Sequence, residues 1–221
     1  RDLVRSRGLG DVYKRQAKEY YDLFPAMIND WRKKWGKDFP FYWVQLANYM
    51  DAVEVPSESL WAQVREAQTQ TLSLPHTGQA VIIDIGEAKD IHPKNKQEVG
   101  RRLALHALHN DYGFSDVVCE SPMPKTVRRV QDKIVVQFDN VADGLIVKNK
   151  YGYLMSFAVA GTDGVYKWVQ AKVAGKDRVV LSCPDVIDPV SVRYAWGDNP
   201  DDANLYNSVG LPATPFEIKI E

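Results

Sequence analysis

The first apolar pattern in the chain has a helical period. From Ala17 onward, large apolar side chains recur at steps of three and four residues, which places them on one stripe of a helix. The stripe consists of Tyr20, Phe24, Met27, Ile28, Trp31 and Trp35. Gly36 follows a basic last turn as a stop signal. The next apolar run, at residues 39–46, is short and rich in aromatic side chains, which predicts a buried strand.

The same order of helix and strand then repeats. A serine within residues 56–59 is placed to cap a second helix. The inner face of that helix would carry Leu60, Val64 and Ala67. Residues 80–84 form a near-continuous apolar run, typical of a parallel strand covered on both faces, and residues 94–108 predict a third helix. This order predicts an α/β fold with parallel strands.

Two strands are too few for a stable sheet of this kind. We therefore expect residues 17–113 to be the C-terminal part of a larger doubly wound, flavodoxin-like domain. After Gly113 the pattern changes to short β-rich stretches separated by turns, which predicts an all-β antiparallel sandwich over residues 114–221. The expected strands are residues 130–138, 145–148, 156–160, 166–173, 178–182 and 191–196. Pro122 and Pro124 mark the boundary, because proline interrupts a continuing element.

Residues 1–16 do not follow either pattern. They carry five Lys and Arg side chains and no clean periodicity. The stretch resembles the adapter-derived leaders that precede some reading frames in metagenomic assemblies, so we expect a non-native leader; a natural basic linker is the alternative.

Charge and composition narrow the classes of partner. The formal net charge is −1, so there is no basic field to hold a phosphate backbone, and nucleic-acid binding is not expected. No apolar run approaches the roughly 20 residues that span a bilayer. Eleven Tyr and six Trp are many for this length and suit either core packing or contact with sugar rings. Cys119 and Cys183 could pair or stay free, and the sequence leaves the oligomeric state open.

The main candidate chemistry lies in the loop at residues 84–96. This loop follows the second predicted strand, and open α/β sheets place ligands at the carboxyl edge of their strands. His92 could take a proton from a hydroxyl nucleophile and return it to a leaving group. Asp90, two residues earlier, could hold the ring in the required tautomer. The alternative is a surface histidine beside a helix-capping aspartate.

Several stretches, in order along the chain, resemble the sialate O-acetylesterase family. They are FPFY at 39–42, VQLA at 44–47, REAQ at 65–68, TGQAVIIDIG at 77–86, DIHPKNK at 90–96, VGRRLAL at 99–105, RYAW at 193–196, NLYN at 204–207, GLPA at 210–213 and PF at 215–216. The resemblance implies a serine esterase of the SGNH hydrolase type that removes acetyl groups from sugar hydroxyls without a metal or cofactor.

The resemblance also implies roles for particular residues. His92 would be the general base and acid, and Asp90 its orienting carboxylate. The wider superfamily spaces this pair as D-x-x-H, a spacing that would put Lys89 in the acidic position, so Asp84 is kept as a second candidate. The family's nucleophile lies in a Gly-Gln-Ser-Asn block, which this chain does not contain. We therefore expect the chain alone to be inactive.

Other expectations are less specific. Gln45, Arg65 and Trp196 are possible pocket residues; for Arg65 a salt-bridged surface position is the alternative, and for Trp196 a place in the sandwich core. His106 and His109 are spaced to share a helix face as metal ligands, although ordinary helix histidines are the simpler interpretation. The resemblance suggests a periplasmic or secreted full-length protein. It leaves the acetylated sugar open, with sialic acid and xylan-type substrates both possible. The competing function is a non-catalytic carbohydrate-binding or structural β-sandwich module.

Overall fold

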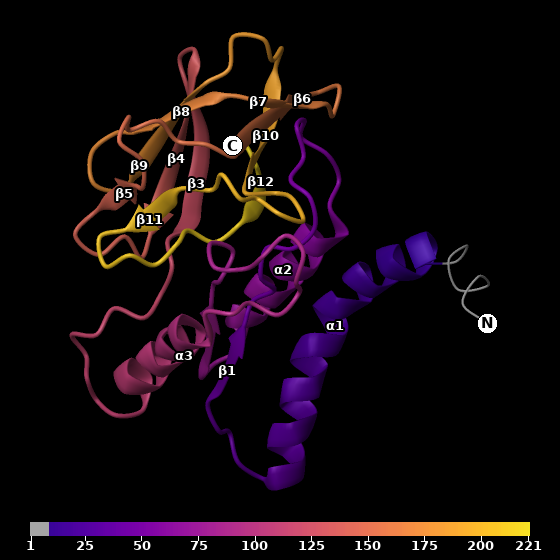
Figure 1. Ribbon diagram of the computed structural model, residues 1–221, viewed down its shortest axis with the longest axis vertical. Coiled ribbons are helices and arrows are strands. Elements are labelled where there is room, and N and C mark those ends of the chain that lie inside the picture. The colour runs from indigo at the N-terminus through magenta and orange to yellow at the C-terminus, as the bar shows by residue number, and fades with distance from the viewer. Residues whose placement is uncertain (1–8) are drawn as a thin grey trace.

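The computed structural model describes residues 9–221, with side chains from Ala17 onward. Figure 1 shows a helical part with a small sheet and, above it, a part built of strands. The helical part contains α1 (Leu9–Trp35), β1 (Phe41–Val44), α2 (Leu60–Gln70), the short 3-10 helix η1 (Thr71–Ser73), β2 (Thr77–Ala80) and α3 (Lys96–Asn110). Helix α1 begins inside the stretch expected to be a leader, of which residues 1–8 lie outside the described residues.

Strands β1 and β2 pair in parallel, with Phe41 opposite Thr77 and Val44 opposite Ala80. Parallel pairing of these two segments is as predicted, but the predicted strand at residues 80–84 is placed too late. The chain after Val44 leaves the sheet once Gln45 N–H has bonded to the Ala80 carbonyl, 3.0 Å away. Beyond that point the second strand has no partner, so residues 81–83 stay buried without being a strand.

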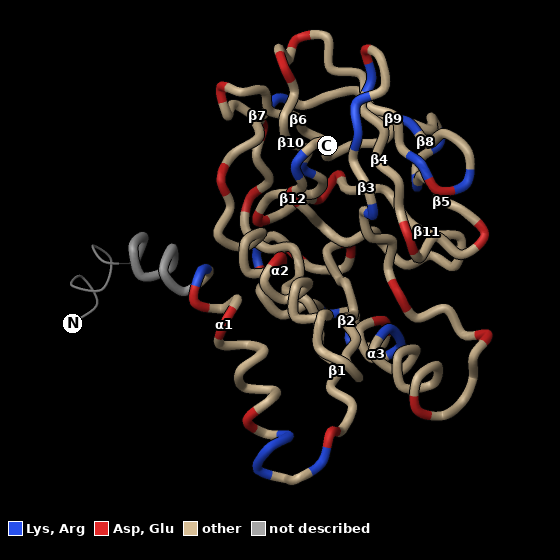
Figure 2. The backbone as a smooth tube through the Cα atoms, turned by 180° about the vertical axis from the view of Figure 1, so that it is seen from behind, with Lys and Arg blue, Asp and Glu red and all other residues tan. Residues whose placement is uncertain are grey.

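Helix α1 covers this small sheet through aromatic contacts. Phe24 and Ile28 are buried against Trp43 of β1, and the Phe24 and Trp43 rings meet edge to face at 5.1 Å. The end of the predicted stripe is different, because the Trp31 and Trp35 side chains are 44% and 71% exposed. Figure 2 shows Lys and Arg gathered at this end of α1.

The inner faces of the other two helices carry polar and charged side chains. Ser59 caps α2 as expected, by accepting a hydrogen bond from the Ala62 N–H. Ala67 lies in the inner face, but Arg65 and Gln68 are also buried there. Leu60 and Val64, which were predicted for that face, are only half-buried. In α3 the buried side chains are Arg102 and His106.

The second part consists of two four-stranded antiparallel sheets, in the orders β12-β10-β6-β7 and β3-β4-β9-β8, and a β11-β5 pair. Apolar side chains from both larger sheets form one core, as the predicted antiparallel sandwich requires. Its strands are β3 (Met123–Val130), β4 (Lys133–Asp139), β5 (Leu145–Val147), β6 (Phe157–Gly161), β7 (Tyr166–Trp168), β8 (Gln170–Val173), β9 (Arg178–Ser182), β10 (Pro189–Tyr194), β11 (Leu205–Asn207) and β12 (Phe216–Lys219).

Three of the observed strands were not predicted, and one predicted strand is divided into two in the structure. β11 and β12 were missed, and β3 was missed because Pro124 argues against a strand; β3 tolerates it as an edge strand with a register shift next to the proline. The predicted strand at 166–173 divides at Val169, because β7 pairs with β6 whereas β8 pairs with β9 of the other sheet.

One buried guanidinium joins the two parts of the chain. Arg65 of α2 has no exposed surface and donates to four backbone carbonyls. Two belong to the loop after β1, at Leu46 (2.8 Å) and Ala47 (2.7 Å), and two follow β10, at Gly197 (2.6 Å) and Asp198 (2.9 Å). Burial lowers the pKa of Arg65 to about 9, with the Asp198 carboxylate opposing that change, so the group stays charged at neutral pH. The salt-bridged surface position considered for Arg65 is wrong.

A second contact joins α3 to the sandwich. Arg102 binds Asp84 through both oxygens, at 2.6 and 2.9 Å, and also donates to the Val81 carbonyl. Tyr206 of β11 donates to the same carboxylate at 3.2 Å. Arg102 further contacts Glu98, whose two oxygens also accept from Arg101.

Replacing Arg65 with alanine should destabilise the chain by about 3–5 kcal/mol, because several buried carbonyls lose their donor at once. Arg65→Lys should recover only part of this loss. The ammonium group of lysine has three donors on one atom and cannot replace the planar guanidinium, which bonds to four carbonyls. Urea unfolding measures both. The exposed Arg128→Ala serves as the matched control. A loss below 1 kcal/mol for Arg65→Ala would contradict the role given to this side chain.

The acidic group on α3 predicts a pH dependence. Hydrogen bonds from Arg101, and then Arg102, lower the pKa of Glu98 to about 2, below its ordinary value near 4.5. A depressed carboxylate pKa stabilises the folded state fully above pH 4.5, and the stabilisation is lost as the pH falls toward 2. Between pH 5 and pH 3 the free energy of unfolding should therefore fall more steeply in the wild type than in Glu98→Gln. Parallel curves would show that Glu98 is not the responsible group.

Candidate active site

The loops that follow β1 and β2 lie together at the carboxyl edge of the small sheet. Their contact depends on Gly86, whose N–H donates to the Asn48 side-chain oxygen at 2.7 Å. A Cβ atom at Gly86 would come within 2.3 Å of the Asn48 carbonyl oxygen, so only glycine permits this approach. Met50 N–H then bonds to the Ala88 carbonyl at 3.0 Å.

A loop of the sandwich closes over the first of these loops. Asn199 accepts a hydrogen bond from the Asn48 side chain (2.8 Å) and donates to the Met50 carbonyl (2.8 Å). Tyr49 N–H bonds to the Asp198 carbonyl, and the Asp198 carboxylate accepts from Ser59 at 2.5 Å. The β1 loop therefore lies between the β2 loop and the sandwich and is bonded to both.

His92 lies on the outer part of the β2 loop. Its side chain is 80% exposed, and its Nδ1 atom is 3.7 Å from an Asp90 oxygen, which is longer than a hydrogen bond. The same Asp90 oxygen accepts from the His92 backbone N–H at 2.9 Å. The carboxylate thus fixes the turn and stands beside the ring, which is free to rotate toward a partner in solvent.

The ends of this loop are tied together beside His92. Lys94 and Glu87 form an ion pair at 2.6 Å, and the hydrogen bond to Glu87 raises the pKa of Lys94. Pro93 is buried, and the Asn95 side chain caps α3 by accepting from Glu98 N–H. The start of α3 therefore holds the backbone immediately after His92.

The other candidate carboxylate is occupied. Asp84 is only 10% exposed, and its two oxygens accept from Arg102 and Tyr206. Among the described residues, no contact joins Asp84 to His92. The geometry places Asp90 beside the imidazole and gives Asp84 a place between α3 and the sandwich.

The three possible pocket residues lie in different surroundings. Gln45 is fully buried, donates to Arg65 O and Thr69 Oγ1, and its Oε1 has no partner within residues 9–221. Arg65 lies beneath the loops, as described above. Trp196 is 6% exposed, and its indole lies 5.0 Å from the Arg193 guanidinium. Of the three, Trp196 contributes to the wall of a cavity described below.

The helix histidines are engaged by the backbone. His106 Nε2 is 3.0 Å from the Gln79 carbonyl, and burial lowers its pKa. His109 Nδ1 is 2.8 Å from the Val117 carbonyl. Over residues 9–221, no three His, Cys, Asp or Glu side chains gather as a metal-binding group. Cys119 and Cys183 are buried and free.

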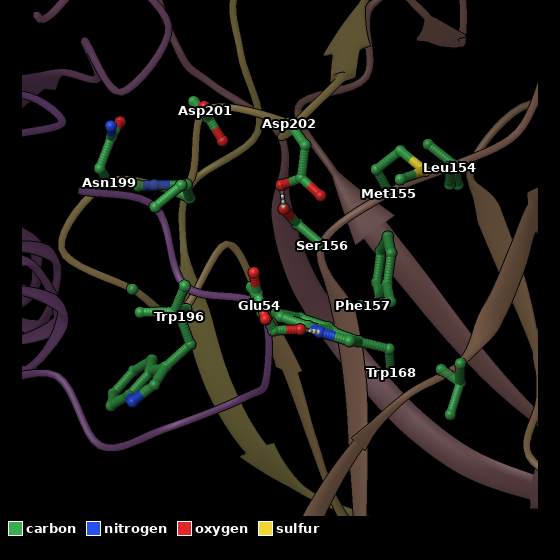
Figure 3. A pocket seen from close by; sticks show the side chains of 15 residues that line it. Glu54, Leu154, Met155, Ser156, Phe157, Trp168, Trp196, Asn199, Asp201 and Asp202 are labelled. Carbon is green, nitrogen blue, oxygen red and sulfur yellow. Dashed lines mark hydrogen bonds between the residues drawn. The ribbon is translucent and has the colours of Figure 1, made fainter. Parts of the chain in front are cut away.

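A cavity that was not predicted lies where the β1 loop meets the sandwich (Figure 3). This junction cavity has a volume of about 300 Å³. Its wall includes Glu54, Ser156, Trp168, Trp196, Asp201 and Asp202. The acidic stretch at 197–202 was the available signal in the sequence, but nothing local shows that it faces Trp168.

No helix in the described part of the chain combines the length and apolar character needed to cross a bilayer.

The chain is similar to known esterases. It is 29% identical over 231 residues to the sialate O-acetylesterase of Mus musculus, covering 91% of this chain and 41% of that protein. The sialate O-acetylesterase of Homo sapiens is 29% identical over 224 residues, covering 89% of this chain and 42% of that protein. No protein-family model matches.

The fold has a solved counterpart. A carbohydrate acetylesterase from Xanthomonas citri superposes with a TM-score of 0.84 and 44% sequence identity, covering 90% of this chain and 46% of that one. The chain thus spans less than half the length of the relatives it matches. Taken together, the curated relatives and this structural match support assignment of the chain to the sialate O-acetylesterase family of carbohydrate esterases.

Proposed function

We propose that the full-length protein hydrolyses O-acetyl esters on carbohydrates and that this chain supplies the general base of that reaction. The observation that carries the proposal is the position of His92. Its imidazole stands exposed at the carboxyl edge of parallel strands, beside the Asp90 carboxylate, on a loop tied at both ends. An exposed ring held in this way can meet a nucleophile from another segment.

The β1–β2 pair and the helices around it would be the end of a doubly wound sheet of the SGNH type, over residues 17–113. The sandwich would form a second domain over residues 114–221. The parallel pairing supports the first assignment, and the single core between two antiparallel sheets supports the second. The family resemblance favours an exported protein.

The chemical role of each residue follows from the reaction class. A serine hydroxyl attacks the acetyl carbonyl while His92 takes its proton, and the imidazolium then protonates the departing sugar oxygen. Water then attacks the acetyl-serine that this step leaves, with the same imidazole taking the proton of the water. The imidazolium returns a proton to the serine oxygen as acetate is released. Asp90 would stabilise the imidazolium after a small rotation of the ring brings Nδ1 into hydrogen-bond range.

The serine is expected outside this chain, which contains no Gly-Gln-Ser-Asn block. The purified 221-residue chain should therefore not hydrolyse 4-nitrophenyl acetate above the background rate, because a triad without its nucleophile loses most of its rate enhancement. Hydrolysis by the chain that disappears in His92→Asn would refute this expectation and place the nucleophile within these residues.

In the full-length protein, His92→Asn should lower kcat on an acetylated sugar by about 10,000-fold, and Asp90→Asn by at least about 100-fold. Folding should be unaffected, since both side chains are exposed. His76→Asn is the matched control, because His76 is also exposed but precedes β2, at the opposite edge of the sheet. The assay compares acetylated sialic acid with acetylxylan. Equal kcat values for His92→Asn and the control would exclude His92 as the base.

A further inference from the structure

The junction cavity is large enough to hold a small ligand. Its volume of about 300 Å³ lies at the lower end of the range for small-molecule pockets. Residues 52–54 of the β1 loop form one side, and the sandwich residues 154–157 and 196–202 form the others. Because Met50 is bonded to both Ala88 and Asn199, the cavity is connected by direct hydrogen bonds to the loop that carries His92.

A second, larger cavity adjoins it on the sandwich. This sheet cavity has a volume of about 600 Å³, lies over the ends of β8, β9 and β4, and is lined by Gln170, Ser182 and the two lysines Lys133 and Lys172. The two cavities share Leu154, Met155, Trp168 and Val169. They lie on either side of the point where the chain crosses from one sheet to the other.

Large apolar side chains remain exposed along this pair of cavities. Trp168 is 43% exposed, Met155 47% and Tyr153 67%. The Trp168 N–H already donates to the Glu54 carbonyl at 2.9 Å, which holds the indole in place. An exposed indole so anchored offers an apolar face of the kind that packs against the C–H face of a sugar ring.

The charged side chains that line the junction cavity are all acidic. Glu54, Asp201 and Asp202 line it, and no Lys, Arg or His within the described residues does. Asp202 accepts a hydrogen bond from Ser156, shown in Figure 3. Ser156 has a φ of +63°, a conformation that is uncommon for residues other than glycine and that recurs at functional sites. Carboxylates accept well from sugar hydroxyls but repel an anionic sugar.

We propose that the two cavities together bind a neutral oligosaccharide, with one sugar ring against Trp168 in the junction cavity and the following rings along Tyr153 and the sheet cavity. The inference rests on the proposed esterase function, for which it selects neutral glycan chains over sialic acid as the substrate class. The oligosaccharide would run from the His92 side of the protein out over the sandwich. Its length, and not only its acetylated ring, would therefore contribute to binding.

The test measures binding separately from catalysis. Isothermal titration of the full-length protein uses xylohexaose and cellohexaose, which carry no acetyl group, and sialyllactose as the anionic probe. At least one hexasaccharide should bind, its xylobiose or cellobiose counterpart should bind at least tenfold more weakly, and sialyllactose should not bind. Trp168→Ala should raise Kd for the hexasaccharide by about tenfold or more, whereas Trp168→Phe, which keeps a ring, should raise it less.

Matched variants separate this inference from the esterase proposal. Trp35→Ala removes a Trp that is 71% exposed on α1 and should leave Kd unchanged. His92→Asn should keep the hexasaccharide Kd while losing the rate on 4-nitrophenyl acetate. Asp201→Asn with Asp202→Asn should allow sialyllactose to bind. Absence of hexasaccharide binding, an unchanged Kd in Trp168→Ala, or equal affinity for sialyllactose would overturn the inference even if the esterase activity is found.

Discussion

Backbone carbonyls that turn inward where two parts of a chain meet must find donors, since an unpaired buried carbonyl costs as much as a lost hydrogen bond. Here one guanidinium meets that need for four of them. Arg65 joins the loop after β1 to the loop after β10, two segments separated by more than a hundred residues. Its planar set of donors suits this task, which an apolar side chain or a lysine could not perform. Together with the Arg102–Asp84–Tyr206 contact, Arg65 holds the helical part against the sandwich.

The candidate active site follows from the same arrangement. Because Arg65 and Asn199 hold the β1 loop, that loop provides a fixed surface against which the β2 loop rests through Gly86 and Ala88. His92 itself takes little part in this network and stays exposed. The network thus supports the backbone on both sides of His92 and leaves its imidazole exposed to solvent.

The junction cavity is a second consequence. It lies between the β1 loop and the sandwich, which are joined by the hydrogen bonds around Asp198 and Asn199 and by the bond from the Trp168 indole N–H to the Glu54 carbonyl. The sandwich therefore supplies an aromatic and acidic wall to a cavity that is hydrogen-bonded to the loop carrying His92. The proposed carbohydrate-binding role of the sandwich and the proposed esterase role of the whole protein are compatible as parts of one function.

The sequence by itself determined the features that depend on near neighbours. The helical period of α1, the serine cap of α2, the parallel order of the two buried runs and the place of Asp90 and His92 after the second run could all be predicted from it. Tertiary structure alone decided that Arg65 is buried, that residues 166–173 divide between two sheets at Val169, and that Trp168 faces Glu54. Local periodicity indicates which face of a helix or strand is apolar. The donors for buried carbonyls and the walls of a cavity come from residues far apart in the chain, so local periodicity does not indicate them.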